Sequence, residues 1–262
     1  MFLFGIIIST LVAVVLCLSR HSDTCCAYLH VEATRMTPPR THEVADPGQH
    51  VIPEPLVSEE DPNHIQAIPL STREHWMRRA NQALSDLASP CPFAAFSSVI
   101  VNHTDRSSSP LGRLICAGVN SGRRRGNPIL HGEIEAINRC SEVLQSPPFD
   151  LTPEAAVLAF RDLTLYTNGE PCPMCASAIR WAGFRECVYG TSIETLIRLG
   201  WTQIEVSSRE IFARSRLFST TTTLIPDVLT AETDPLFSWQ FDVNASCPDT
   251  CVRDDTGACV PV

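Results

Sequence analysis

Two short motifs contain the residue types that bind a catalytic metal ion. His131-Gly132-Glu133 is followed, 41 residues after His131, by Pro171-Cys172-Pro173-Met174-Cys175. One imidazole and two thiolates supply three of the four ligands of tetrahedral zinc and leave one position open for water. Zinc lowers the pKa of such a water toward ~7, which makes it a nucleophile at neutral pH. The motifs therefore predict Zn²⁺ held by His131, Cys172 and Cys175.

The residues around the motifs suit thiolate ligands. Pro173 is favoured in the first turn of a helix, so Cys172 and Cys175 are expected at a helix N-terminus. The helix macrodipole stabilises the thiolate form there. His131 is expected to open a helix of its own, so two helix N-termini would converge on the metal.

Glu133 is the candidate general acid and base, because it is a carboxylate close to the metal that is not itself a ligand. Each motif alone has a simpler interpretation. An isolated C-x-x-C is a structural zinc knuckle or a redox pair, and an isolated H-x-E is a solvated helix start. Together, with a strand before the cysteines and a helix after each motif, they favour catalysis.

The surrounding sequence alternates between helical and extended patterns. A helix is expected from Ser71, where Ser71-Thr72-Arg73-Glu74 is typical of a capping box. The expected helices are 71–88, 131–144, 173–182 and 193–199, and the expected strands are 96–101, 114–119, 163–167, 186–189 and 203–206. The first two strands form a hairpin with a polar loop, 102–112. This order predicts an α/β fold with three layers, α/β/α, and a mixed central sheet.

The spaced motif H-x-E…P-C-x-x-C resembles the signature of the zinc-dependent cytidine/deoxycytidylate-type deaminase superfamily, and residues 71–206 are similar to it throughout. The resemblance implies a cytidine-deaminase-like domain in which His131, Cys172 and Cys175 hold zinc and Glu133 carries a proton to the leaving ammonia. Asn120 stands 11 residues before His131, where cytosine, guanine and tRNA adenosine deaminases of this superfamily place a substrate-contacting Asn.

Resemblance to the individual subfamilies is mixed. His131-Gly132-Glu133-Ile134 is similar to fungal cytosine deaminases, whereas residues 170–175 look more like guanine and tRNA adenosine deaminases. Pro92-Phe93-Ala94-Ala95 occupies the position of the pocket floor in these families. We expect a hydrolytic deaminase of a small aminated nucleobase or nucleoside, cytosine- or guanine-like. The alternatives are a tRNA adenosine deaminase and a non-catalytic, secreted zinc-binding protein.

Charge separates the partner classes. The net charge is −9, yet residues 71–218 carry 16 Arg against 14 acids, so the acidity lies in the flanks. This balance disfavours nucleic acid as a partner, because nucleic-acid enzymes usually present a basic face. The run Arg123-Arg124-Arg125 is interpreted as a solvated loop, with a phosphate contact as the alternative. A homodimer is left open.

The ends of the chain indicate its compartment. Residues 2–18 are uncharged and predict a signal peptide within 1–19, or else a membrane anchor at 2–18. A Pro-rich lead-in (20–70), the deaminase domain (71–210) and a C-terminal extension (211–262) follow. Cysteines at 247, 251 and 259 favour a disulfide-tied loop, and the sequons at 102–104 and 244–246 agree with secretion. The cysteines at 91, 116, 140 and 187 are expected to be buried small hydrophobes.

Overall fold

The structure is a computed structural model, and it describes residues 67–107 and 109–262. These residues belong to one unit of the chain, 60–262. The expected leader, 1–19, and the lead-in as far as residue 66 lie outside the described residues. Within the described ranges, no helix is long and apolar enough to cross a membrane.

A five-stranded mixed sheet forms the centre of the domain. Its strand order is β2-β1-β3-β4-β5. β1 runs antiparallel to β2 and to β3, whereas β3, β4 and β5 run parallel. The bounds are β1 Ser97–Asn102, β2 Arg113–Val119, β3 Leu163–Gly169, β4 Glu186–Thr191 and β5 Thr223–Ile225. The expected mixed sheet and its opening hairpin are confirmed.

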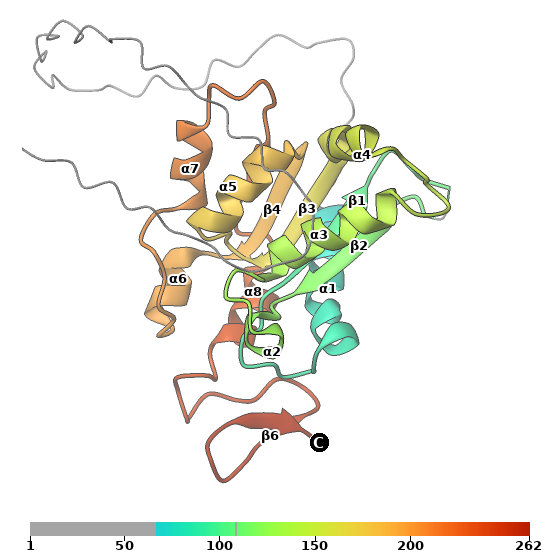
Figure 1. The fold of residues 1–262 in the computed structure, drawn as a ribbon. Helices are drawn as coiled ribbons and strands as arrows, with labels where there is room; N and C mark the ends of the chain where they lie inside the picture. The colour runs from blue at the N-terminus through green and yellow to red at the C-terminus, as the bar shows by residue number, and fades with distance from the viewer. Residues whose placement is uncertain (1–66, 108) are drawn as a thin grey trace, which may run out of the picture. The chain divides into compact units, whose positions relative to one another are not determined.

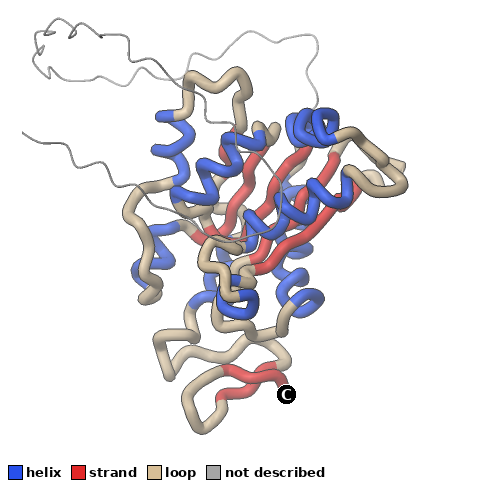
Figure 2. Tube along the Cα trace, viewed as in Figure 1, coloured by secondary structure: helices blue, strands red, loops and turns tan. Residues whose placement is uncertain are grey.

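Helices cover both faces of this sheet, with blue helices in front of the red strands and behind them (Figure 2). The α-helices are α1 Leu70–Leu87, α2 Gly122–Arg125, α3 Gly132–Leu144, α4 Pro153–Ala159, α5 Pro173–Ala182, α6 Ile193–Arg198, α7 Ser208–Arg214 and α8 Thr230–Thr233. Two 3-10 helices are η1 Phe160–Asp162 and η2 Asp234–Phe237, and β6 Cys251–Arg253 pairs with β7 Cys259–Pro261 near the C-terminus.

Alternating strand residues divide the core into two layers, because successive side chains of a strand point to opposite faces. Val99 and Val101 pack in the cluster that contains the buried face of α1. Ile100, between them, packs in the cluster that contains α3 and α5. The three-layer α/β/α fold is thus confirmed, with α3 and α5 on the face opposite α1 (Figure 1).

The helix that carries the first motif lies unusually close to the sheet. A Cβ placed on Gly118 of β2 would lie 2.2 Å from the backbone nitrogen of Ala136 in α3. Only glycine therefore allows this approach. A disulfide between Cys116 and Cys140 joins the same strand and helix.

Two local predictions are wrong. Residues 203–206 form no strand, and Ile204 there is 64% exposed, so an extended segment would have no apolar side to bury. The last strand of the five-stranded sheet is instead β5, where Thr223 pairs with Glu186 of β4. The capping box is also absent, because α1 begins at Leu70 with Pro69 as its N-cap, which places Ser71 inside the first turn.

The four domain cysteines are buried and lie outside the candidate ligand set, as expected, but only Cys187 is a free thiol. Among the described residues the disulfides are Cys91–Cys251, Cys116–Cys140 and Cys247–Cys259. An apolar neighbourhood does not distinguish a buried thiol from a buried disulfide. The first pair also joins cysteines 160 residues apart, which no local pattern indicates.

Candidate metal centre and pocket

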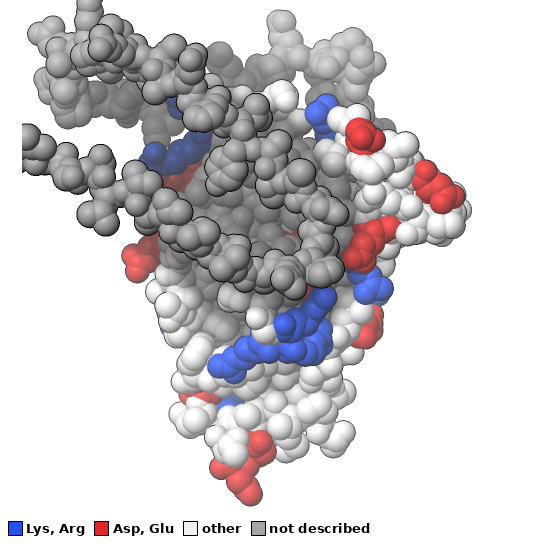
Figure 3. Space-filling model, in the orientation of Figure 1, with Lys and Arg blue, Asp and Glu red and all other residues white. Residues whose placement is uncertain are grey.

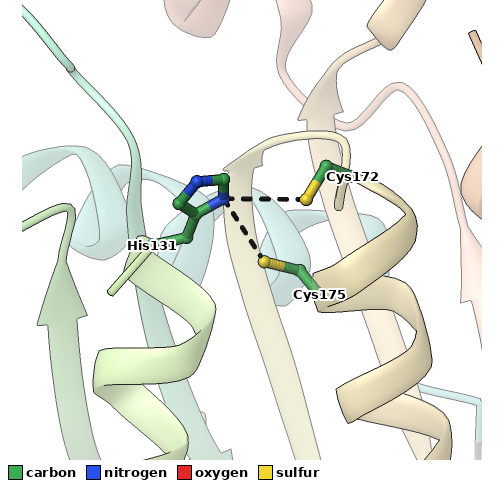
Figure 4. Close-up of side chains that lie close together, drawn as sticks. All are labelled: His131, Cys172 and Cys175. Carbon is green, nitrogen blue, oxygen red and sulfur yellow. Dashed lines mark hydrogen bonds between the residues drawn. The ribbon is translucent and has the colours of Figure 1, made fainter. Parts of the chain in front are cut away.

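The two motifs meet where α3 and α5 begin. His131 is the N-cap residue of α3 and Cys172 is the N-cap residue of α5. The Nδ1 atom of His131 lies 3.6 Å from the Sγ atom of Cys172 and 3.6 Å from that of Cys175. Figure 4 shows the imidazole facing both sulfurs from the opposite helix. The three expected ligands are therefore brought together.

Their spacing fits zinc. Tetrahedral zinc lies about 2.05 Å from a histidine nitrogen and about 2.3 Å from a thiolate, which separates the two ligand atoms by about 3.6 Å. The observed nitrogen–sulfur distances are 3.6 Å, and all three ligand atoms lie within 4.8 Å of one another. The set of one nitrogen and two sulfurs also suits a borderline-soft ion.

The environment of the sulfurs favours a thiolate. A hydrogen bond from the Cys175 thiol is the largest of several effects that lower the pKa of Cys172 to about 4. His131 acts in the same direction, and its own pKa is raised, mainly by its hydrogen bond to Cys172. The free backbone N–H groups at the start of α5 add a favourable dipole.

Glu133 lies in the first turn of α3 and is only 5% exposed. Burial, as the largest cause, and the charge of Cys172 together raise the pKa of Glu133 to about 7. His131 and Cys175 act in the opposite direction on this pKa, so the carboxyl group lies within electrostatic reach of the candidate ligands. A carboxyl group with this pKa both gives up and accepts a proton near neutral pH.

A pocket of about 720 Å³ opens beside His131. Its wall includes Asn120, together with Phe93 and Trp201, which give it a mainly apolar surface. The backbone N–H of Asn120 donates to Phe96 O, and its Oδ1 accepts from the N–H of Gly122. The structure thus brings Asn120 and the expected pocket floor around Phe93 to the metal centre.

The arginine run forms α2 at the rim of this pocket. Arg123 and Arg124 line the pocket, and Arg125 pairs with Glu135 at 3.1 Å. Figure 3 shows basic side chains gathered on this face near α2. The guanidinium of Arg123 also lies over the ring of Phe93, 5.7 Å from its centre.

Glu170 is a buried carboxylate that the sequence did not single out. One oxygen accepts from the N–H of Ile193 at 2.8 Å, and the other accepts from the N–H and the hydroxyl of Ser208 at 2.8 and 2.7 Å. It therefore connects the starts of α6 and α7 to the segment that leads to Cys172. The only signal in the sequence was an acid directly before Pro171.

Trp201 is a pocket residue that no sequence pattern indicated. It follows α6, its indole N–H donates to Phe237 O at 2.9 Å, and its ring lies 5.7 Å from that of Phe93. No local pattern marked it, because its place in the pocket depends on residues from three distant segments.

Comparison with known proteins identifies the motif-bearing region. Residues 70–191 match the family model described as the cytidine and deoxycytidylate deaminase zinc-binding region. The chain is 55% identical over 42 residues to a probable cytosine deaminase of Schizosaccharomyces pombe, covering 15% of this chain and 26% of that protein. It is 37% identical over 71 residues to the guanine deaminase of Bacillus subtilis, covering 27% and 38% respectively.

A tRNA-specific adenosine deaminase of Rickettsia bellii is 29% identical over 80 residues, covering 30% of this chain and 48% of that protein. The matched segments thus span from about a quarter to about half the length of these relatives.

Proposed function

We propose that this chain, whose residues 70–191 form a cytidine and deoxycytidylate deaminase zinc-binding region, is a zinc-dependent hydrolytic deaminase of a small aminated nucleobase or nucleoside. The observation that carries the proposal is the convergence of His131, Cys172 and Cys175 at the spacing that zinc requires, with the buried Glu133 within electrostatic reach of them. A purely structural zinc site needs neither that carboxylate nor an open position.

The three ligands would hold the metal, which supplies a Lewis acid that activates water at neutral pH. Glu133 takes a proton from the attacking water and delivers it to the amino group that leaves. The bond between the ring carbon and the amino nitrogen then breaks. The water oxygen remains on that ring carbon, so the products are the oxo ring and ammonia.

Asn120 is proposed to orient the ring. Its amide both donates and accepts hydrogen bonds, which suits a ring edge that carries a carbonyl and a nitrogen. The apolar wall formed by Phe93 and Trp201 suits the flat face of a base. We favour cytosine or guanine slightly over adenine, since the motifs resemble the cytosine and guanine deaminases in separate places, and partial matches to a probable cytosine deaminase and a guanine deaminase support this choice.

A second candidate, tRNA adenosine deamination, is favoured by one observation. Arg123 and Arg124 line the pocket rim, where guanidinium groups could contact the phosphates beside a flipped-out base. Against it, residues 71–218 carry only a slight excess of basic side chains, and the flanks are acidic.

The test is a screen for ammonia release by zinc-loaded protein on cytosine, guanine, adenine and their nucleosides, beside inosine formation in a tRNA anticodon stem-loop. We expect turnover of a small substrate, and a loss of several orders of magnitude in Glu133→Ala with zinc retained. Editing of the stem-loop with no small-molecule activity would select the second candidate. Unchanged turnover in Glu133→Ala would refute the mechanism.

A further inference from the structure

The end of the chain returns to the pocket from outside the matched family region. Residues 237–262, here called the C-terminal segment, begin at the last residue of η2 and include the β6–β7 pair. A disulfide and a hydrogen bond link this segment to the loop 88–96, which contributes Phe93 to the pocket. The disulfide joins Cys91 to Cys251. The hydrogen bond, of 3.1 Å, runs from the side-chain amide of Gln240 to Phe93 O.

Aromatic side chains fill the space between the C-terminal segment and the pocket wall. The ring of Phe241 lies 5.8 Å from that of Phe93 and 5.2 Å from that of Trp201. Trp239 is buried, and the centre of its ring lies 6.1 Å from that of Phe93 in an edge-to-face arrangement. Such arrangements are favourable beyond the area that they bury.

The C-terminal segment also packs closely against Gly200, the residue before Trp201. A Cβ on Gly200 would lie 3.0 Å from the ring of Phe241, and Gly200 has a φ of +96°. Trp201, the next residue, is also held from this side, because its indole N–H donates to Phe237 O. Both aromatic residues of the pocket wall therefore have a C-terminal side chain or carbonyl behind them.

We propose that the C-terminal segment is a positioning element of the pocket: Phe241, Trp239 and the Cys91–Cys251 bond hold Phe93 and Trp201 in place and so set the affinity for substrate. Phe93 is 44% exposed and sits in a loop without regular structure. A loop with few buried contacts opens readily unless something packs against it. Phe241 does not line the pocket itself, so it acts only through its neighbours.

The kinetic part of this inference rests on the proposed function, whereas its structural part does not. If Phe93 and Trp201 bind the ring equally in the ground state and the transition state, loosening them raises KM and leaves kcat nearly unchanged. The metal centre lies on α3 and α5, so its zinc content is expected to stay constant.

The experiment compares Phe241→Ala with Phe218→Ala in the full-length, zinc-loaded protein. Phe241 is 52% exposed, so its variant is expected to fold. Phe218 is a matched control, because its ring packs at a tilt against that of Trp181, 4.6 Å away, and it is absent from the pocket wall. In Phe241→Ala we expect faster hydrogen exchange at 88–96, KM raised about tenfold and kcat within about twofold. Phe241→Leu, which restores most of the volume, should recover most of the affinity.

A second pair of variants tests the disulfide link. Cys91→Ser/Cys251→Ser removes the bond to the pocket loop, and Cys247→Ser/Cys259→Ser removes a bond that joins two parts of the C-terminal segment only. We expect faster hydrogen exchange at residues 88–96 in the first double variant than in the second. We also expect a clearly larger rise in KM in the first.

Three results would overturn the inference: unchanged exchange at 88–96 in Phe241→Ala, equal changes in Phe218→Ala, or a loss confined to kcat. If no substrate is turned over by any form while the exchange still rises, the positioning role is upheld and the proposed function alone fails.

Discussion

Single side chains at the metal centre combine two requirements that conflict elsewhere in proteins. A thiolate and a carboxylate normally avoid burial, because removing a charge from water is costly. Here Cys172 is stabilised by a hydrogen bond from Cys175 and by the start of α5, while Glu133 responds to burial with a raised pKa. The same site thus suits the roles proposed for them, a metal ligand and a proton carrier.

Zinc content is the first test at this scale. Cys172→Ser and His131→Ala each leave two ligands, so we expect the bound zinc to fall from one per chain to a small fraction, with at least about 100-fold weaker affinity. Metal analysis after dialysis measures this. Cys187→Ala is the matched control, because that buried thiol lies outside the ligand set. Full zinc in both ligand variants would contradict the assignment.

A second residue-scale prediction concerns His103, away from the metal. Its Nδ1 lies 2.9 Å from Leu111 O and its Nε2 lies 2.8 Å from the hydroxyl of Tyr166. These contacts suit a neutral ring that donates to the carbonyl and accepts from the hydroxyl. Burial lowers the pKa of His103, and the nearby Arg185 and Arg73 lower it too, whereas the Leu111 carbonyl and Glu186 oppose the shift.

The sign of the pH effect follows from this. Above a pH of about 6.5 the ring is neutral in both the folded and the unfolded state. Below it, the unfolded chain binds a proton that the folded protein resists, so the free energy of unfolding falls as the pH falls. His103→Gln keeps both hydrogen bonds without titrating. Urea unfolding from pH 7.5 to 5 should therefore show a shallower decline in the variant, and identical slopes would refute the prediction.

At the scale of elements, Glu170 shows how one carboxylate aligns several helices. Its oxygens receive the N–H groups at the starts of α6 and α7, and its backbone N–H donates to Thr191 O at the end of β4. Only Pro171 separates Glu170 from Cys172. A displacement of α6 or α7 would therefore be transmitted to the metal loop and to Trp201, which lies between these helices.

Glu170→Gln tests this connection. The amide of Gln would direct its own hydrogens at a backbone N–H, which leaves buried donors unpaired at a cost of about 1–3 kcal/mol. We expect a lower melting temperature together with weaker zinc binding. Glu210→Gln is the control, because its pair with Arg214 on α7 is exposed and contributes little. Comparable losses in both variants would show that Glu170 has no special role.

At the scale of the whole molecule, disulfides and charge describe the environment that the chain suits. Disulfides at Cys116–Cys140 and Cys247–Cys259 fit an oxidising compartment. The acidic flanks and the nearly balanced domain suit a protein that binds small molecules rather than a polyanion. Neither property determines the substrate.

We expect the chain to enter the secretory pathway and to carry glycans at Asn102 and Asn244. Asn244 is exposed, and Asn102 ends β1 at the polar loop. Glycosidase treatment should increase the gel mobility of natively expressed protein. Asn102→Gln and Asn244→Gln should each remove the part of this mobility shift that one glycan causes. Unchanged mobility of the wild-type protein, or free thiols at Cys247 and Cys259, would contradict this expectation.

The sequence by itself determined the parts that depend on local pattern. Short apolar runs rich in β-forming residues located β1 and β2, and Pro173 located the start of α5 correctly. His131, Glu133 and the two cysteines were recognisable because each pair is held by a helix start, so that short spacings carry the geometry. Asn120 was singled out by the resemblance to the deaminases, through its distance from His131, and it lines the pocket.

Only the tertiary structure decided how distant segments meet. The bond between Cys91 and Cys251, the link through Glu170 and the place of Trp201 in the pocket join residues that are between 23 and 160 positions apart or come from separate elements. The last strand of the five-stranded sheet, β5, is formed by residues 223–225, which pair with the edge of β4. Such pairings depend on which surfaces remain unburied once the sheet has formed, and no local sequence pattern encodes that.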